Sequence, residues 1–205
     1  MPTAMNMCRR YYRNALFGLL SALLLFAGCG TLGFLKKPEV TVMRSQNAEM
    51  WKNLRKLGRD GDWVVIRGYT SVDDNISALT GSPLSHAAVL DRQRFCLIES
   101  DRDGVHETAM EAFLYKAHRV LLVRPVWSKG KTGRAALLFA RSLIGKPYDF
   151  TGLVGLNTPD TYYCSELAVK IYAPCFRQVD VLPAIVSPGE LLRWGRILWD
   201  SGERE

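Results

Sequence analysis

Residues 86–100 read HAAVLDRQRFCLIES, two apolar runs joined by a short polar turn. This pattern predicts a β-hairpin with strands at 86–91 and 94–100. In a tight antiparallel hairpin, the start of the first strand meets the end of the second. We therefore expect His86 and Glu99 to be cross-strand neighbours on one face of the sheet.

Short strands and helices alternate through the rest of the chain beyond residue 45. The β-branched and apolar runs at 63–67 and 119–126 predict two more strands. Apolar spacing and capping residues predict helices at 46–57, 76–79, 108–117, 132–144, 165–172 and 187–194. No internal repeat or linker interrupts 45–205. The expected fold is one α+β domain, with helices flanking a small, mostly antiparallel sheet.

The N-terminal segment has the pattern of an export signal. Arg9, Arg10 and Arg13 precede an apolar run over 15–28, which is shorter than the roughly 20 residues of a bilayer-spanning helix. We expect a signal peptide over 1–28, a tether over 29–44 and the folded domain over 45–205. The alternative is an uncleaved anchor helix that reaches to about residue 34.

The sequence around Cys29 resembles a bacterial lipobox, in which small residues precede a cysteine that becomes lipidated. Phe26, Ala27 and Gly28 stand before Cys29, and Gly30 follows it. The resemblance implies a lipid-anchored protein of the bacterial cell envelope. Without an Asp after the cysteine, the periplasmic face of the outer membrane is favoured for a Gram-negative host.

The composition is that of a globular protein. The chain has 205 residues, is 48% hydrophobic and carries 27 Lys and Arg against 20 Asp and Glu, for a net charge of +7. Disordered, collagen-like and multi-span membrane proteins are excluded. No basic stripe accompanies the positive charge, so no nucleic-acid partner is expected.

Cys8 lies in the expected signal peptide and Cys29 would carry lipid, so three of the five cysteines remain: Cys96, Cys164 and Cys175. An odd number in an oxidising compartment indicates at least one free thiol, although a pairing of Cys96 with Cys175 stays open. The three histidines lack the spacing of zinc ligands, so no metal is expected. Cys164 begins a predicted helix, where the helix dipole favours the thiolate.

These features suggest nucleophilic catalysis by a thiol. Cys164 would attack a carbonyl, His86 would transfer the proton and Glu99 would orient the imidazole. Backbone N–H groups at the start of the Cys164 helix would stabilise the oxyanion. Each residue considered alone also has a non-catalytic interpretation. Cys164 could be a buried apolar side chain, His86 a turn or core histidine, and Glu99 a solvated or arginine-paired charge.

Six segments between residues 58 and 194 stand in the order of a known family. They are GDWVVIRG, ISALTGSPLSHAAVL, CLIES, GKPYDF, YYCSELAVKIY and IVSPGEL. The pattern resembles the YiiX-like family, a circularly permuted papain-like branch of the NlpC-type peptidases and amidases, in which the His strand precedes the Cys helix.

The resemblance implies a papain-like fold with Cys164 as nucleophile, His86 as base and Glu99 as the third residue. Tyr163, Tyr148 and Asp149 would line the substrate site as substrate-binding residues, since they match positions that do so in the family. The chemistry implied is hydrolysis or transfer at amide or ester carbonyls without a cofactor; relatives similar to lecithin:retinol acyltransferase move acyl chains.

The expected function is a membrane-anchored cysteine hydrolase or acyltransferase with a thioester intermediate. Its substrate would be a peptide, an amino-acid amide or a lipid. The alternative is a catalytically silent envelope lipoprotein that binds a peptide or lipid in the papain-like groove. The filled triad positions favour the enzyme, although fold and motif alone do not establish turnover.

Overall fold

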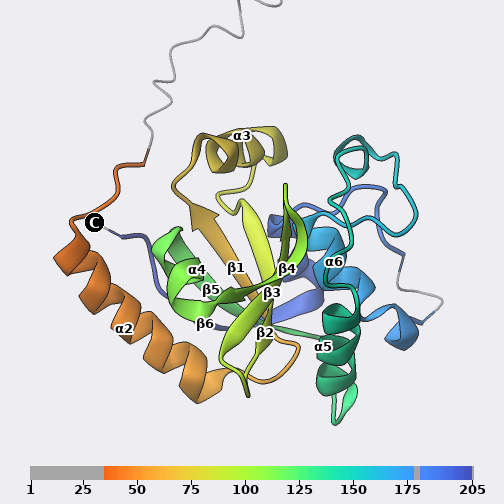
Figure 1. Cartoon of the computed structure of the whole chain (residues 1–205), viewed down its shortest axis with the longest axis horizontal. Helices are drawn as coiled ribbons and strands as arrows, with labels where there is room; N and C mark the ends of the chain where they lie inside the picture. The colour runs from red at the N-terminus through yellow and green to blue at the C-terminus, as the bar shows by residue number, and fades with distance from the viewer. Residues whose placement is uncertain (1–34, 178–180, 205) are drawn as a thin grey trace, which may run out of the picture. The chain divides into compact units, whose positions relative to one another are not determined.

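A six-stranded antiparallel sheet, in the order β4-β3-β2-β1-β5-β6, forms the centre of the computed structural model (Figure 1). The structure describes residues 35–177 and 181–204, so the expected signal peptide and Cys29 lie outside the described residues. The strands are β1 Trp63–Gly68, β2 His86–Asp91, β3 Cys96–Asp101, β4 Gly104–Ala109, β5 Ala117–Pro125 and β6 Gly195–Asp200.

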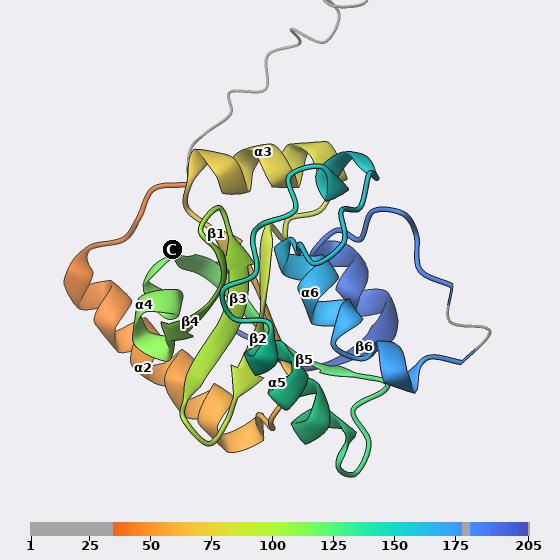
Figure 2. The same ribbon diagram turned by 45° about the vertical axis from the view of Figure 1, so that its right-hand side comes forward.

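Helices pack on both faces of this sheet (Figures 1 and 2). The α-helices are α2 Val40–Leu57, α3 Ser71–Thr80, α4 Met110–Tyr115, α5 Thr132–Ser142 and α6 Cys164–Lys170, and the 3-10 turns are η1 Gly152–Val154, η2 Ala173–Cys175 and η3 Gly189–Trp194. None of the helices in the described ranges combines the length and hydropathy needed to cross a bilayer. The expected α+β class with an antiparallel sheet and flanking helices is confirmed.

The central strand β1 divides the core into two clusters. Trp63 and Val65 point into the cluster that contains residues of α5 and α6, whereas Val64 and Ile66 point into the cluster that contains residues of α2 and α4. This follows from the two-residue period of a strand. Because both faces are covered, β1 is apolar over its first four residues rather than alternating.

Helix α6 is fixed on the sheet by two buried hydrogen bonds. The indole N–H of Trp63 donates to the carbonyl of Ala168 at 2.8 Å. The hydroxyl of Tyr172, just beyond α6, donates to the carbonyl of Gly61 at 2.9 Å. These bonds tie the helix that begins at Cys164 to the start of β1.

Three expectations at element boundaries are wrong. Helix α2 begins at Val40 instead of residue 46, so its first five residues belong to the expected tether. Met43, in these five residues, is already buried against the domain. The Ser45 hydroxyl donates to the carbonyl of Val42 within the helix and does not cap its N-terminus. Residues 108 and 109 belong to β4, which pairs with β3 along its length. The strand β6 after the η3 turn was not expected.

Candidate active site

The structure brings the three expected site residues together at one end of the sheet. Cys164 is the first residue of α6, His86 is the first residue of β2, and Glu99 lies in β3. The strand register places Ala88 opposite Glu99, so His86 is the diagonal neighbour of Glu99 and not its direct partner. The His86 Nε2 atom lies 2.5 Å from Glu99 Oε2.

The thiol of Cys164 is buried among polar partners. It is hydrogen-bonded to the His86 side chain and to the backbone N–H of Ala87, and its Sγ lies 3.9 Å from Ser165 Oγ. The pairing of β2 with β3 begins at Ala88, so the N–H of Ala87 lies outside that ladder and is available to the sulfur. Since Glu99 holds Nε2 of His86, Nδ1 is the imidazole nitrogen left for the thiol.

Burial opposes both charges of this pair, and mutual attraction overcomes it. Desolvation lowers the pKa of His86, but the charge and hydrogen bond of Cys164, followed by those of Glu99, raise it to about 10. Desolvation raises the pKa of the Cys164 thiol, but His86 and the Ala87 N–H bring it below its ordinary value. Each partner therefore favours the charged form of the other, imidazolium for His86 and thiolate for Cys164.

Glu99 is fully buried and its two oxygens are saturated with donors. Oε1 accepts from Thr108 Oγ1 at 2.5 Å, and Lys116 Nζ donates to both oxygens at 2.8 Å. Desolvation raises the pKa of Glu99, but His86 and Lys116 hold it far below its usual range. Glu99 is therefore a carboxylate throughout the physiological range.

Lys116 is the site residue that sequence reasoning missed. The expected alternative was an arginine partner for Glu99, but Lys116 takes that place from the end of α4. Its position over Glu99 depends on β4, which carries the chain back along β3 before α4 begins. Because β4 was not predicted, the sequence pattern did not indicate that Lys116 contacts Glu99.

Four ionisable groups thus lie one after another at this site: Cys164, His86, Glu99 and Lys116. The ring of Phe113 packs beside two of them, 5.9 Å from the His86 ring centroid and 5.0 Å from Lys116 Nζ. Phe113 is itself fully buried and excludes water from that side. In such a site, each pairwise attraction is stronger than it is in water.

The three residues expected to line a substrate site have different surroundings. Burial and the charge of Cys164 raise the pKa of Tyr148, so the phenol lies within electrostatic range of the thiol. The hydroxyl of Tyr163, by contrast, accepts a hydrogen bond from Val186 N–H at 2.9 Å and is buried. Burial raises its pKa to about 12.

Asp149 organises the loop that follows it. Its carboxylate accepts from Thr151 Oγ1, Gly152 N–H and Thr158 N–H at 2.8, 2.8 and 3.1 Å, and it is 1% exposed. Burial raises the pKa of Asp149, but these donors lower it overall. The Asp149 carboxylate therefore orders residues 149–158, and its role as a substrate-binding residue stays a prediction.

Glu99, Asp101 and His106 place one potential metal-ligating atom each within 4.8 Å of one another. Glu99 already binds the Lys116 ammonium through both oxygens. A metal ion would have to displace that ammonium. The donor set therefore suits the observed ion pairs better than a cation site.

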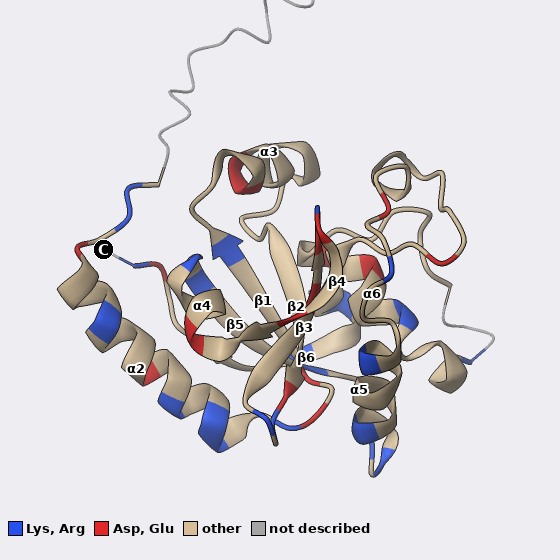
Figure 3. Cartoon of the chain, viewed as in Figure 1, with Lys and Arg blue, Asp and Glu red and all other residues tan. Residues whose placement is uncertain are grey.

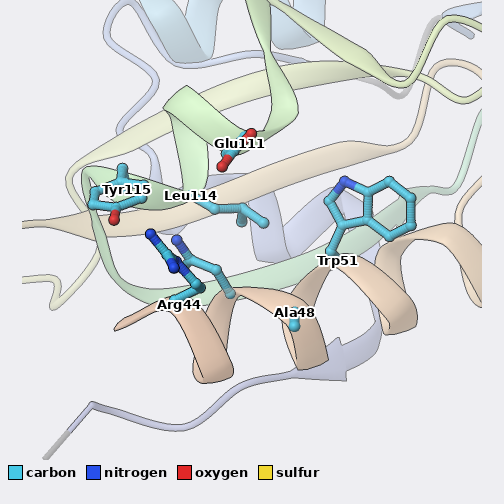
Figure 4. A pocket seen from close by; sticks show the side chains of 7 residues that line it. Arg44, Ala48, Trp51, Glu111, Leu114 and Tyr115 are labelled. Carbon is cyan, nitrogen blue, oxygen red and sulfur yellow. The ribbon is translucent and has the colours of Figure 1, made fainter. Parts of the chain in front are cut away.

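A cavity of about 290 Å³ lies between α2 and α4, away from the thiol (Figure 4). Arg44, Ala48 and Trp51 of α2 face Glu111 and Leu114 of α4 across it. It contains none of the residues around Cys164. The chemistry of the thiol site, rather than this cavity, therefore identifies the candidate active site.

Comparisons with known proteins show the family of the chain. Residues 58–186 match the family of permuted papain-like amidase enzymes, YaeF/YiiX, designated C92. A crystal structure of the metalloprotein yiiX from Escherichia coli O157:H7 is 23% identical, with a TM-score of 0.49; the match covers 58% of this chain and 66%, just under two thirds, of that one. No curated protein matches the chain.

Proposed function

The chain belongs to the C92 family of permuted papain-like amidases, and we propose that it hydrolyses an amide or ester carbonyl with Cys164 as nucleophile. The observation that carries the proposal is the buried contact of Cys164 with His86, which raises the pKa of the imidazole to about 10 and lowers that of the thiol. A thiolate formed in advance needs no separate deprotonation before it attacks.

In the proposed reaction, Cys164 Sγ bonds to the carbonyl carbon and the carbonyl π electrons move to oxygen. Backbone N–H groups of the first turn of α6, which precede the hydrogen bonds of the helix itself, donate to that oxyanion. His86 gives its proton to the leaving nitrogen or oxygen as the bond to carbon breaks, which leaves a thioester on Cys164.

The second half of the reaction uses the now neutral imidazole. His86 takes a proton from water as the water oxygen bonds to the thioester carbon. Breakdown releases a carboxylic acid and restores the thiolate and imidazolium. An alcohol or amine in place of water would make the same steps an acyl transfer, so the acceptor decides between hydrolase and acyltransferase.

Glu99 and Lys116 act as positioning residues in this scheme. Glu99 holds the imidazole through Nε2 and stabilises its charge. Lys116 contacts both carboxylate oxygens and so restricts the rotation of Glu99. Neither residue needs to exchange a proton during turnover.

We further propose that the protein acts in the bacterial envelope, anchored through lipid on Cys29. The support is the sequence alone: an apolar run after three arginines, followed by small residues and a cysteine. The substrate would then be a peptide, an amino-acid amide or a lipid present at the membrane.

Trapping the acyl-enzyme tests this proposal. The full chain is mixed with p-nitrophenyl acetate, and peptide mass spectrometry locates the acetyl group; we expect it on Cys164, removable by hydroxylamine. A Cys164→Ala variant should lose at least about a thousandfold of turnover, whereas a Cys96→Ala variant should retain it. Acetylation elsewhere, or turnover that survives in Cys164→Ala, would overturn the proposal.

A further inference from the structure

Two loops beside the candidate site expose large apolar side chains to solvent. Residues 150–159 and 181–189 contain no charged residue, in a chain that is 23% charged. We use the term apolar rim for Leu79 of α3, Phe150, Leu153, Val154 and Leu156 of the first loop, and Ile185 of the second. Four of them, Leu79, Val154, Leu156 and Phe150, are 87, 71, 68 and 63% exposed.

The segments of the rim are connected to one another. A Cβ on Gly155 would lie 3.7 Å from the Ile185 side chain, and Asn157 Nδ2 donates to the carbonyl of Ala184 at 3.4 Å. The Cα of Gly189 packs so closely on Ser82 that a Cβ there would meet its hydroxyl. The second loop therefore lies between the first loop and the end of α3.

The rim surrounds the catalytic end of the fold. The Ser165 hydroxyl, next to Cys164, donates to the carbonyl of Val186 at 2.6 Å. The ring of Phe150 packs on that of Tyr148, with centroids 4.8 Å apart, and Tyr148 lies within electrostatic range of the thiol. A partner on the rim would thus lie close to the reacting sulfur.

The described chain also begins at this end. Figures 1 and 2 show residues 35–37, α3 and the loop over 150–156 at the upper end of the domain. Lys37 Nζ lies 5.8 Å from the ring centroid of Tyr69, directly before α3. Lys36 and Lys37 are exposed there, whereas the 150–159 loop is uncharged up to Asp160 (Figure 3).

We propose that the apolar rim rests on the surface of a lipid bilayer, so that the end of the sheet carrying Cys164 faces the membrane. Thirty-four residues precede the first described residue, and they contain the apolar run over 15–28. This inference rests on the membrane anchor proposed above, which would join the described domain at residue 35, at the end that carries the rim. Exposed apolar side chains, with Lys36 and Lys37 at the same end of the domain, suit the interface of an anionic bilayer.

Quenching of an introduced tryptophan by brominated lipid tests the proposal. Full-length chains carrying Phe150→Trp or Leu156→Trp are reconstituted into vesicles of phosphatidylethanolamine and phosphatidylglycerol with brominated acyl chains. Leu138→Trp on α5, where the native leucine is 52% exposed, is the matched control. All chains share the five native tryptophans, so differences between them report the introduced ring.

We expect brominated lipid to quench the Phe150→Trp and Leu156→Trp chains more than the Leu138→Trp chain. Adding Val154→Asp to Phe150→Trp should remove the difference, because a charge at the rim opposes contact with acyl chains. Equal quenching in all three chains would overturn the proposal. A second result would also overturn the proposal: without lipid, the Phe150→Trp chain sediments as a dimer and its tryptophan emission is shifted to the blue. A second copy of the chain would then cover the rim.

Discussion

Both ends of the sheet bury charged groups, but only one end includes a histidine, a side chain that can gain and lose a proton near neutral pH. At the end where β1 begins, the fully buried Asp62 accepts two hydrogen bonds from Arg124 at 2.9 and 2.7 Å. Beside it, Asp91 at the end of β2 pairs with Arg141 at 2.7 Å. Arginine stays protonated at every accessible pH, so these pairs hold elements together without exchanging protons.

At the opposite end, Glu99 faces an imidazole, which in turn faces a thiol. Burial raises the pKa of Asp62 despite Arg124, whereas the partners of Glu99 outweigh its burial and lower its pKa. The comparison teaches that burial of charge does not by itself mark an active site. What distinguishes the end with the candidate site is a titratable partner, His86, that interacts with both the Glu99 carboxylate and the Cys164 thiol.

The largest effect is expected from removing the Asp62 carboxylate at the end of the sheet where β1 begins. Asp62→Ala leaves Arg124 buried without its carboxylate, so the free energy of unfolding should fall by about 3–5 kcal/mol. kcat/KM per folded molecule should stay unchanged. Urea unfolding measures the free energy of unfolding. Active-site titration counts the folded molecules to which kcat/KM is referred.

Arg134→Ala is the control for that prediction. Arg134 contacts Asp60 at 2.9 Å but is 43% exposed, so its loss should cost less than about 1 kcal/mol. A fall in kcat/KM of the folded Asp62→Ala protein would contradict the division between the two ends.

A smaller effect is expected at the catalytic end from Glu99→Gln, which keeps the shape of the side chain and removes its charge. kcat/KM should fall by about a hundredfold or more. The pKa of His86 should drop from about 10, so the alkaline limb of the pH–activity profile should move to lower pH. Glu107→Gln, on the neighbouring β4, should leave the profile unchanged; an unaltered profile in Glu99→Gln would refute the role of its charge.

The smallest effect is expected from Lys116→Met. Glu99 keeps its charge and its bond to His86 but loses the contact that fixes both oxygens. We expect kcat/KM to fall by about tenfold, without the downward shift of the alkaline limb that Glu99→Gln produces. Lys116→Arg should recover part of the loss. Full activity in Lys116→Met would show that Lys116 only fills space.

Local sequence pattern was sufficient for four of the six strands and for the proximity of His86 to Glu99. The hairpin of β2 and β3 has strong β-branched and apolar runs with a polar turn, and its parity places His86 and Glu99 on one face. Strands β4 and β6 were missed because GVHETA is half polar and Gly195 begins a strand directly after a helical turn. Their pairing with β3 and β5 stabilises them, and no local pattern reports that pairing.

The site contacts that sequence did not predict all depend on tertiary placement. Lys116 meets Glu99 only because β4 and α4 bring it there. Asp149 is adjacent to Tyr148 in sequence, but its carboxylate accepts hydrogen bonds from its own loop, whereas the Tyr148 phenol lies within electrostatic range of the thiol. The apolar rim comes from three segments that are distant in sequence.

The most direct test of the account is the rate at which iodoacetamide alkylates Cys164 as a function of pH, with Cys96 as the internal control. Burial and Glu107 raise the pKa of Cys96 to about 11, so it should react only in strong alkali. Cys164 should react well below pH ~8.5, the ordinary value for a thiol, and at a constant rate up to about pH 10, where His86 loses its proton. In His86→Ala, burial remains without the imidazolium, so the Cys164 profile should move above that ordinary value. A Cys164 that titrates like Cys96 in the unmodified chain would contradict the thiolate–imidazolium pair on which the proposed reaction depends.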